Sequence, residues 1–235
     1  MDKIAVVTGA GSGVGRAVAI ELTRQGWQVA ALGRRPEMLD ETAKLAGKDV
    51  IPMPCDISKP SEVDAMAGRV RAELGVPGAV VNSAGVNVPK RALADLSVDD
   101  YQHLVDVNLT GAFLCVHAFL PDMRQRGSGT FVHVISDAGL FANRVSGAAY
   151  IAAKFGLTGL SDTINAEERR NGIRSVAVFP GEINTPLLLK RPVIPTEDAR
   201  LKMLQPEDVA ACVLFGINLP ERATVEQLLV RPRWL

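Results

Sequence analysis

Tyr150 and Lys154 are the residues of this chain whose types and spacing could most directly do chemistry. They stand four residues apart in a stretch with helical character, so their side chains would lie on one helix face, one turn apart. A tyrosine hydroxyl, with a pKa of about 10, is a poor base at neutral pH. One ammonium about 5 Å away, at an effective dielectric near 20, would favour the phenolate by roughly 3 kcal/mol. The pair could therefore exchange a proton with a substrate oxygen, although this spacing also occurs in helices without a function.

A glycine-rich segment from Thr8 to Gly15 follows the first apolar run and leads into a helical stretch. The pyrophosphate of a dinucleotide needs bare backbone N–H groups, a tight turn and the positive end of a helix dipole. No Gly-Lys-Ser/Thr follows, which disfavours a nucleoside triphosphate loop and favours a hydride-carrying dinucleotide. The predicted pyrophosphate-binding residues are Gly9, Gly11, Ser12, Gly13, Val14 and Gly15.

Arg34 and Arg35 follow the second expected strand, which ends at Leu32 and Gly33. A cofactor with a free ribose 2′-hydroxyl needs a carboxylate at this place. Guanidinium groups instead suit a 2′-phosphate, so the sequence predicts NADP as cofactor, with NAD as the second choice. The alternative is a solvated pair of arginines at the start of a helix.

Short apolar runs alternate with amphipathic stretches along the whole chain. This rhythm predicts one α/β domain over residues 1–235, a Rossmann-type doubly wound, mostly parallel sheet with helices on both faces. The expected strands are 4–8, 28–32, 50–52, 79–82, 130–136, 173–179 and 227–231. The expected helices are 14–24, 36–45, 60–73, 99–124, 149–170 and 206–219.

Residues 185–205 break this alternation, because Pro186, Pro192 and Pro195 stand close together. Such spacing forbids a regular helix over the proline-rich part, so a long loop is expected. Loops of this length inside a compact domain are usually functional or disordered. The segment is either a lid over the substrate, in which Lys190 and Arg191 could bind a carboxylate, or an ordinary surface loop.

The composition points to a small-molecule partner. Lys plus Arg balance Asp plus Glu at 26 each, which gives no field that would attract nucleic acid or an anionic membrane. The three cysteines and three histidines lack metal-ligand spacing, so no metal is expected. The N-terminus lacks the features of a secretory signal, and the apolar stretch 107–121 is shorter than the roughly 20 residues of a membrane span. A cytoplasmic location is therefore expected.

Four motifs occur in a set order over essentially the whole chain. They are the Thr8–Gly15 turn, the segment Asn82-Ser83-Ala84-Gly85, Ser136 ahead of Tyr150 and Lys154, and the segment Pro180-Gly181-Glu182-Ile183-Asn184-Thr185. In this combination the chain resembles the short-chain dehydrogenase/reductase family. The resemblance implies homodimers or homotetramers, in agreement with the apolar circumference of the helix expected around residues 104–121, which needs a second cover.

The resemblance also implies roles for individual residues. Tyr150 would be the general acid/base, and Lys154 would lower its pKa and hold the nicotinamide ribose. Ser136 would position and polarise the substrate oxygen, and Asn108 would support a water-linked proton relay to the lysine. The remaining cofactor contacts would come from Asp56 and Ile57 at the adenine, Ile183 and Thr185 at the carboxamide, and Asn82, Ala84, Gly85, Pro180 and Gly181.

The chain departs from the family pattern in three places. Ser83 stands where a second asparagine is common, and the C-terminus lacks a glycine pair. Ser136 lies fourteen residues before Tyr150, one more than the commonest spacing, which leaves Ser146 as a rival for its role. The expected function is an NADP(H)-favouring oxidoreductase that interconverts a small ketone or aldehyde and an alcohol. A dehydratase or epimerase of the same fold and a cofactor-sensing regulator are the alternatives, and the substrate stays open.

Overall fold

Seven parallel strands form one sheet in the computed structural model, which describes residues 3–47 and 49–234. The predicted domain also includes residues 1, 2, 48 and 235, which lie outside the described residues. The predicted α/β doubly wound fold is confirmed, with each expected strand present in the order β3-β2-β1-β4-β5-β6-β7. The strands are β1 (Ile4–Thr8), β2 (Gln28–Gly33), β3 (Val50–Pro54), β4 (Ala79–Asn82), β5 (Gly129–Val134), β6 (Ile173–Pro180) and β7 (Gln227–Val230).

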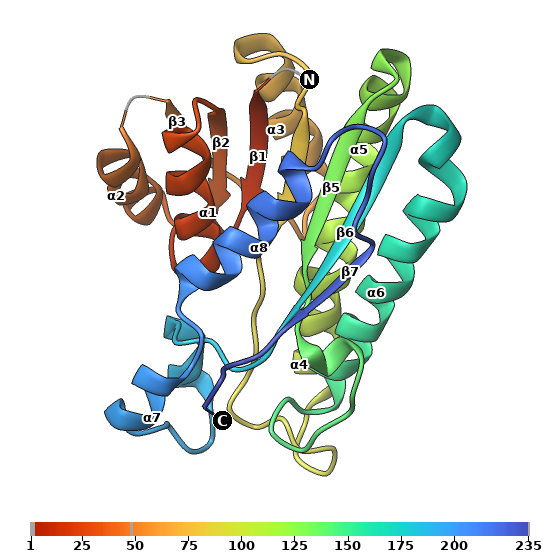
Figure 1. Ribbon diagram of the computed structural model, residues 1–235. Helices are drawn as coiled ribbons and strands as arrows, with labels where there is room; N and C mark the ends of the chain where they lie inside the picture. Colours follow the sequence, from red (N-terminus) through yellow and green to blue (C-terminus); the bar gives the residue numbers. More distant parts are fainter. Residues whose placement is uncertain (1–2, 48, 235) are drawn as a thin grey trace.

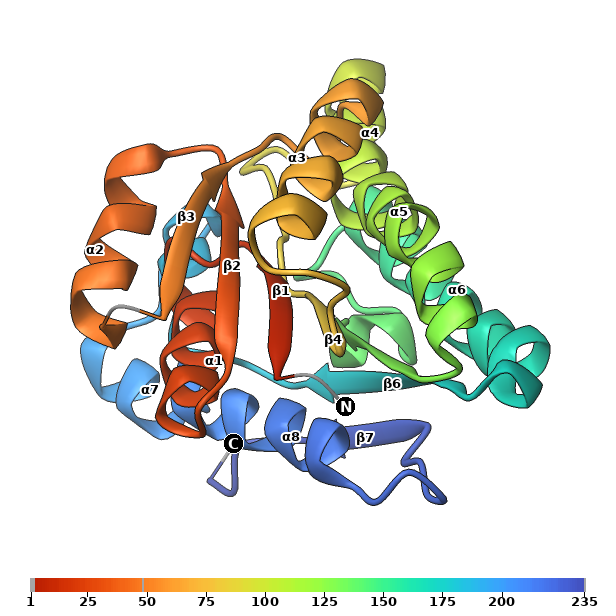
Figure 2. The ribbon, with the colours of Figure 1, turned by 90° about the horizontal axis from the view of Figure 1, so that it is seen from above.

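Helices cover both faces of this sheet, as Figures 1 and 2 show. On one face α1 (Gly13–Arg24), α2 (Pro36–Ala46) and α8 (Pro206–Asn218) pack around one apolar cluster. On the other face α3 (Pro60–Glu73), α5 (Gly111–Arg126) and α6 (Ala148–Glu168) pack around a second. The inner strands β1, β4, β5 and β6 are therefore buried on both sides, which is the reason they read as continuous apolar runs, whereas the edge strand β7 is partly exposed.

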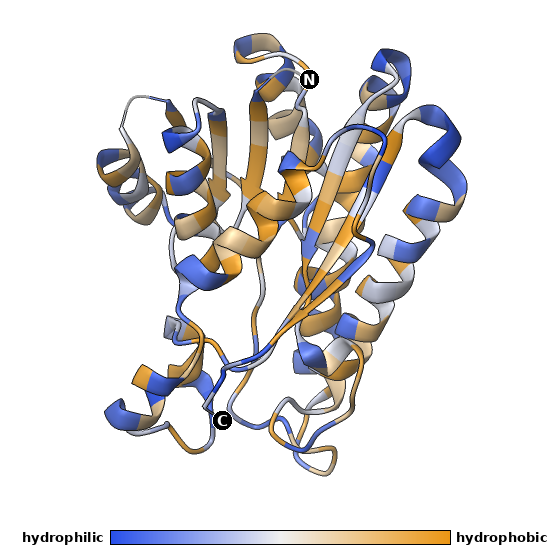
Figure 3. Cartoon of the chain, viewed as in Figure 1, coloured by the Kyte–Doolittle hydropathy of each residue, from blue (hydrophilic) through white to orange (hydrophobic). Residues whose placement is uncertain are grey.

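Strand β1 shows how these runs divide between the two layers. Ala5 and Val7 belong to the cluster under α1 and α8, whereas Val6 belongs to the cluster under α3 and α5. Alternate side chains of a strand point to opposite faces, so one short apolar run serves two cores. Figure 3 shows the apolar strands between helices whose polar residues lie outside.

The strand order reverses at β1, and this reversal positions the site. From β1 the chain adds β2 and β3 on one side and then crosses over to add β4 on the other. The connections at the carboxyl ends of β1 and β4 therefore leave in opposite directions. In open α/β sheets a ligand crevice forms at such a switch point.

The helix expected at 99–124 is one long rod with an irregular middle. It consists of α4 (Val98–Val105), a π-helical turn (Asp106–Thr110) and α5. These 29 residues are long and apolar enough to cross a membrane by length and composition alone. In the structure one side of the rod packs on the sheet through the fully buried Cys115, Phe119 and Met123.

The outer side of the rod and of α6 leaves aromatic side chains exposed. Tyr101, Phe113 and Phe155 are each more than two-fifths exposed. An exposed apolar face is typical of a surface that another chain covers. The homodimer or homotetramer stays a prediction, which sedimentation of the purified protein would measure.

The segment 185–205 is more ordered than expected. The structure forms a 3₁₀-helix at Pro186–Lys190 and a short helix α7 at Glu197–Lys202. The prediction of a segment without a regular helix is therefore wrong for α7, because residues 196–203 carry no proline and the Thr196 hydroxyl caps the helix by accepting from the Ala199 N–H at 3.3 Å. The segment closes on itself where Ile183 pairs with Leu204.

Candidate active site

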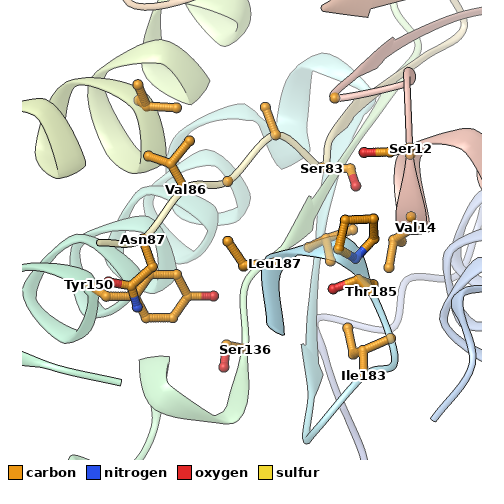
Figure 4. A pocket seen from close by; sticks show the side chains of 18 of the residues that line it. Ser12, Val14, Ser83, Val86, Asn87, Ser136, Tyr150, Ile183, Thr185 and Leu187 are labelled. Carbon is orange, nitrogen blue, oxygen red and sulfur yellow. The ribbon is translucent and has the colours of Figure 1, made fainter. Parts of the chain in front are cut away.

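One cavity of about 570 Å³ opens at the carboxyl ends of β1 and β4 and holds both predicted functional groups. The glycine turn lines one end, and Ser136, Tyr150 and Lys154 line the other. Figure 4 shows Leu187 between the group with Ser12 and Thr185 and the group with Tyr150 and Ser136. All predicted site residues line this cavity except Asn82 and Asn108, which are buried.

The glycine turn takes a backbone course that other residues could not follow. Gly9 has φ +68°, and a β-carbon there would lie 2.9 Å from the Ala84 Cα. A β-carbon on Gly15 would lie 2.4 Å from the Gly9 carbonyl oxygen. These glycines therefore allow β1, α1 and the segment after β4 to approach closely at the cavity floor.

Side chains hold this turn from behind. The Thr8 hydroxyl accepts hydrogen bonds from the Ser83 and Ala84 N–H groups, both at 3.0 Å. Arg16 donates to the Gly11 carbonyl at 2.6 Å, and the Thr42 hydroxyl donates to the Ala10 carbonyl at 2.9 Å. The prediction did not give Thr8 this role of joining the ends of β1 and β4, since the register of the two strands is not visible in the sequence.

The N-terminus of α1 faces the cavity and suits a phosphate. Its N-cap, Ser12, makes no side-chain capping hydrogen bond, and both Ser12 and Val14 line the cavity. The first N–H groups of a helix lack intrahelical acceptors and carry the positive end of the dipole. A β-carbon on Gly13, at φ +53°, would lie 3.2 Å from the Thr185 Cγ2, so the glycine keeps this approach open. The turn fits the pyrophosphate of a dinucleotide.

The far end of the cavity carries the residues expected around the adenosine. Arg34 and Arg35 are exposed and line the cavity after β2, and Asp56 and Ile57 line it after β3. Burial of Asp56 alone would raise its pKa, but the hydrogen bonds from the Ser58 hydroxyl and N–H and the charge of Arg34 outweigh it and lower the pKa. Because its pKa is lowered, Asp56 is ionised, and its carboxylate lies near the exposed arginines.

Lys154 lies deep beside Tyr150. Its side chain is 2% exposed, and its ammonium donates to the Val134 carbonyl at 3.1 Å. The Nζ atom lies 5.5 Å from the centroid of the Tyr150 ring. Burial lowers the pKa of Lys154 to about 8, because a low-dielectric surrounding disfavours the charged form.

Tyr150 does not have the lowered pKa that its neighbour led us to expect. Burial of the hydroxyl and, to a lesser extent, the charge of Asp137 raise the pKa of Tyr150 to about 12. The hydrogen bond with Ser136 and the charges of Arg91 and Arg191 act in the lowering direction without offsetting the burial. Tyr150 is therefore a proton donor in this state of the chain, which suits the protonation of a carbonyl oxygen.

Ser136, rather than its rival Ser146, is the serine whose side chain acts on the pKa of Tyr150, which it lowers. Ser146 also lines the cavity, but its N–H donates to Asn143 and its carbonyl accepts from Asn87. Ser136 itself has φ +146°, the only positive φ among the described residues other than glycine. Its hydroxyl accepts from the Ala138 N–H at 3.1 Å. A side chain at such a φ is strained by about 1–3 kcal/mol, and strain of this kind is concentrated at functional sites in proteins.

We expect Ser136→Gly to be more stable than Ser136→Ala by about 1 kcal/mol, because both lose the hydroxyl but only glycine relieves the strain. At an ordinary backbone position glycine is instead less stable than alanine by about 0.5–1 kcal/mol. Urea unfolding of the two variants measures the difference. A glycine variant less stable than the alanine variant would show that the backbone at Ser136 is not strained.

Asn108 sits in the π-helical turn and holds the loop after β4. Its Oδ1 accepts from the Val86 N–H at 3.1 Å, and its Nδ2 donates to the Val86 and Leu104 carbonyls at 3.0 and 2.8 Å. A β-carbon on Gly85 would lie 3.2 Å from the Asn108 Oδ1 and 3.9 Å from the Lys154 Nζ. The side-chain amide is thus occupied by backbone groups next to Lys154, where it positions the loop.

Asn82 and His133 form a buried pair behind the cavity. The Asn82 Nδ2 lies 3.3 Å from the His133 Nδ1, and neither side chain lines the cavity. Burial lowers the pKa of His133 to about 3, so the ring is neutral. Within residues 3–47 and 49–234, no three His, Cys, Asp or Glu side chains gather in a way that could hold a metal ion.

Arg91 is the main cavity residue that the sequence analysis missed. Arg91 is 6% exposed. It lies between the loop that follows β4, the loop before α6 and the 3₁₀-helix at Pro186–Lys190. The 3₁₀-helix also reaches the cavity through Leu187 and Leu188, and Arg191 follows it there. Residues 192–205 of the predicted lid do not line the cavity. In the sequence, the only indication of a role for Arg91 is its position in the loop that follows the Asn82–Gly85 motif.

Comparison with known proteins gives the class of this fold and site. Residues 3–192 match the family model described as short chain dehydrogenase. An uncharacterized oxidoreductase of Staphylococcus aureus strain MRSA252 is 32% identical over 232 residues, with 98% of this chain and 97% of the relative covered. The chain belongs to the short-chain dehydrogenase family and is an oxidoreductase.

Two solved structures of dehydrogenases share its architecture. The closed form of a serine dehydrogenase complexed with NADP⁺ is 26% identical, with a TM-score of 0.89 over 97% of this chain and 94% of the other. An alcohol dehydrogenase of the archaeon Thermococcus sibiricus, complexed with 5-hydroxy-NADP, is 28% identical, with a TM-score of 0.86 over 100% of this chain and 98% of the other.

Proposed function

We propose that the protein transfers hydride reversibly between NADP(H) and a small ketone or aldehyde and the corresponding alcohol. The observation that carries this proposal is the single cavity in which a pyrophosphate-binding turn and two exposed arginines share the space with Ser136, Tyr150 and Lys154. When bound, the nicotinamide supplies or accepts the hydride. The chain's own residues bind and orient the cofactor and the substrate, and they move the proton.

The residues that would hold the cofactor lie along the cavity in the order of its chemical groups. Arg34 and Arg35 would hold the 2′-phosphate, and Lys154 would hold the nicotinamide ribose together with Tyr150. Asn82 would support the cofactor site from a buried position behind the residues that line the cavity. The remaining contacts would come from Gly9, Gly11, Ser12, Gly13, Val14 and Gly15 at the pyrophosphate, from Asp56, Ile57, Ala84 and Gly85, and from Pro180, Gly181, Ile183 and Thr185.

The proton chemistry follows from the protonation states in the cavity. In carbonyl reduction the Tyr150 hydroxyl donates its proton to the substrate oxygen as that oxygen gains negative charge. The Ser136 hydroxyl, which lines the cavity with Tyr150, offers a second hydrogen bond to the same oxygen. Lys154 then favours the tyrosinate, and Asn108 keeps the loop after β4 in place beside Lys154. Alcohol oxidation uses the same groups in reverse.

Absorbance of the reduced nicotinamide, followed in the near ultraviolet with a panel of ketones and alcohols, tests the proposal directly. Net consumption of NADPH by a ketone supports it. A dehydratase or epimerase would change its substrate without net change in the cofactor. A regulator that only senses the cofactor would bind NADPH and turn over nothing.

We expect Arg34→Ala combined with Arg35→Ala to raise the KM for NADPH about 10- to 100-fold and to leave the KM for NADH within about threefold. The reason is that each charge-assisted hydrogen bond to a phosphate contributes about 1.5–3 kcal/mol, and only NADP carries the 2′-phosphate. Steady-state kinetics with both cofactors measure this.

Lys44→Ala is the matched control, because Lys44 is an exposed cation on α2, the helix that follows the two arginines, and does not line the cavity. It should affect the two cofactors equally. If the double arginine variant also weakened both cofactors equally, the preference for NADP would be refuted while the hydride-transfer proposal would stand.

A further inference from the structure

Two arginines lie at the substrate end of the cavity, close to Tyr150. Arg91 comes from the loop after β4, and Arg191 follows the 3₁₀-helix at Pro186–Lys190. Both line the cavity, and the charges of both act on the Tyr150 hydroxyl. They also act on each other, so two like charges share one small space.

Arg91 is a buried cation without a carboxylate partner. It is 6% exposed, and its side chain donates to the carbonyl oxygens of Val88 at 2.7 Å, of Val145 at 3.3 Å and of Lys190. No acidic group of the described part of the chain lies within ion-pair distance of it. Three neutral acceptors use three of the five N–H donors of a guanidinium and leave its charge uncompensated. An unpaired buried charge is destabilising.

The acidic groups nearby already have partners of their own. Glu182 accepts from the Arg191 Nη1 at 2.7 Å, and Asp137 lies 3.5 Å from the Arg231 Nη2. Both carboxylates are more than a quarter exposed, so they face solvent as well as these arginines. The Arg191 side chain is one-fifth exposed, and the residue lines the cavity. Neither acidic group therefore supplies a counter-charge to Arg91.

We propose that Arg91 and Arg191 form a carboxylate-binding pair, and that the substrate is a small keto acid or hydroxy acid whose reacting carbon lies beside Tyr150. This inference rests on the proposed hydride transfer. The uncompensated charge of Arg91 favours an anionic group on the substrate. The planar guanidinium fork also fits the two oxygens of a carboxylate.

The neighbouring Lys190 does not take part. Its side chain is exposed and does not line the cavity, and only its backbone carbonyl reaches Arg91. Of the two basic residues that the sequence offered for a carboxylate, the structure places Arg191 alone in the cavity. Lys190 is therefore a matched control for Arg191, since the two stand side by side and carry the same charge.

The test compares a keto acid with its uncharged ester. Reduction of acetoacetate and methyl acetoacetate, and of levulinate and methyl levulinate, is followed with NADPH on the wild-type protein and on Arg191→Gln and Lys190→Gln. We expect the wild type to prefer the acid of at least one pair. In Arg191→Gln the acid-to-ester ratio of kcat/KM should fall about 10- to 100-fold, mainly through the KM of the acid, the size expected for one lost hydrogen bond to a charged group. Lys190→Gln should keep the wild-type ratio.

Arg91 needs a more conservative change, because it also joins three loops. Arg91→Lys keeps the positive charge but loses the planar guanidinium group, so it should lower the acid-to-ester ratio of kcat/KM. The unfolding temperature of this variant is measured alongside the kinetics. A variant that unfolds would leave the comparison of Arg191→Gln with Lys190→Gln to decide. Equal ratios in those two variants, or a wild type that prefers the esters, would overturn the carboxylate pair.

Direct binding separates this inference from the proposed function. Titration calorimetry with isobutyrate, which has no carbonyl to reduce, should show binding to the wild-type protein saturated with NADPH and at least tenfold weaker binding to Arg191→Gln. If ketones are reduced but isobutyrate binds equally to both proteins, the carboxylate pair fails and the hydride transfer stands. If no ketone or keto acid is reduced while isobutyrate binding depends on Arg191, the hydride transfer fails and the anion site stands.

Discussion

Tyr150→Phe should lower kcat for ketone reduction by a factor of about 10³, within the range of 10² to 10⁴ that a positioned general acid contributes. The substitution removes only the hydroxyl, the group that carries the proton. The ring can keep its place above the Lys154 ammonium, 5.5 Å from its centroid. We therefore expect the loss in kcat rather than in the affinity for the cofactor, as measured by single-turnover kinetics with NADPH.

A matched control is Tyr101→Phe, which removes the only other tyrosine hydroxyl of the chain from the exposed side of α4. It should retain wild-type turnover. NADPH fluorescence on titration should show that Tyr150→Phe still binds the cofactor within a few-fold of the wild type. A Tyr150→Phe variant with turnover within tenfold of the wild type would refute the assignment of Tyr150 as the proton donor.

The fold could be predicted because each layer of the structure requires particular residue types over short segments of the sequence. A strand covered on both faces must be apolar throughout, as Val6 and Val7 show by facing opposite clusters. The glycine turn from Thr8 to Gly15 was predictable for a similar reason. Gly9 approaches Ala84, and Gly15 approaches Gly9, too closely to admit a side chain. Such requirements act over a few residues, so the sequence displays them.

The features that were missed depend on contacts between distant segments. Arg91 matters because it meets Val145 and Lys190, which lie 54 and 99 residues further along the chain. The pKa of Tyr150 is likewise set by how deeply the hydroxyl is buried, which a four-residue spacing from Lys154 does not reveal. Helix α7 was missed because the prolines on its N-terminal side were given more weight than the proline-free stretch that follows them.

Lys154→Met should abolish turnover and at the same time stabilise the cofactor-free protein at pH 7 by about 1–3 kcal/mol. Burial lowers the pKa of Lys154 from 10.5 to about 8. This difference of about 2.5, at 1.36 kcal/mol for each pH unit, amounts to roughly 3 kcal/mol by which the buried ammonium destabilises the fold below pH 8. Loss of the hydrogen bond to the Val134 carbonyl at 3.1 Å offsets about 1 kcal/mol of that gain.

The pH dependence distinguishes this effect from ordinary repacking. Between pH 8 and 10.5 the unfolded chain holds the Lys154 proton and the folded chain does not, so the wild type becomes more stable as the pH rises through this window. The raised pKa of Tyr150 acts in the opposite direction above pH 10, but it is present in both proteins and largely cancels in the comparison. The advantage of Lys154→Met should therefore shrink by about 2 kcal/mol between pH 7 and pH 10 in urea unfolding. Lys44→Met, at an exposed lysine, should show no such change. A Lys154→Met advantage that stays constant with pH would mean that burial does not lower the pKa of Lys154 in the folded protein.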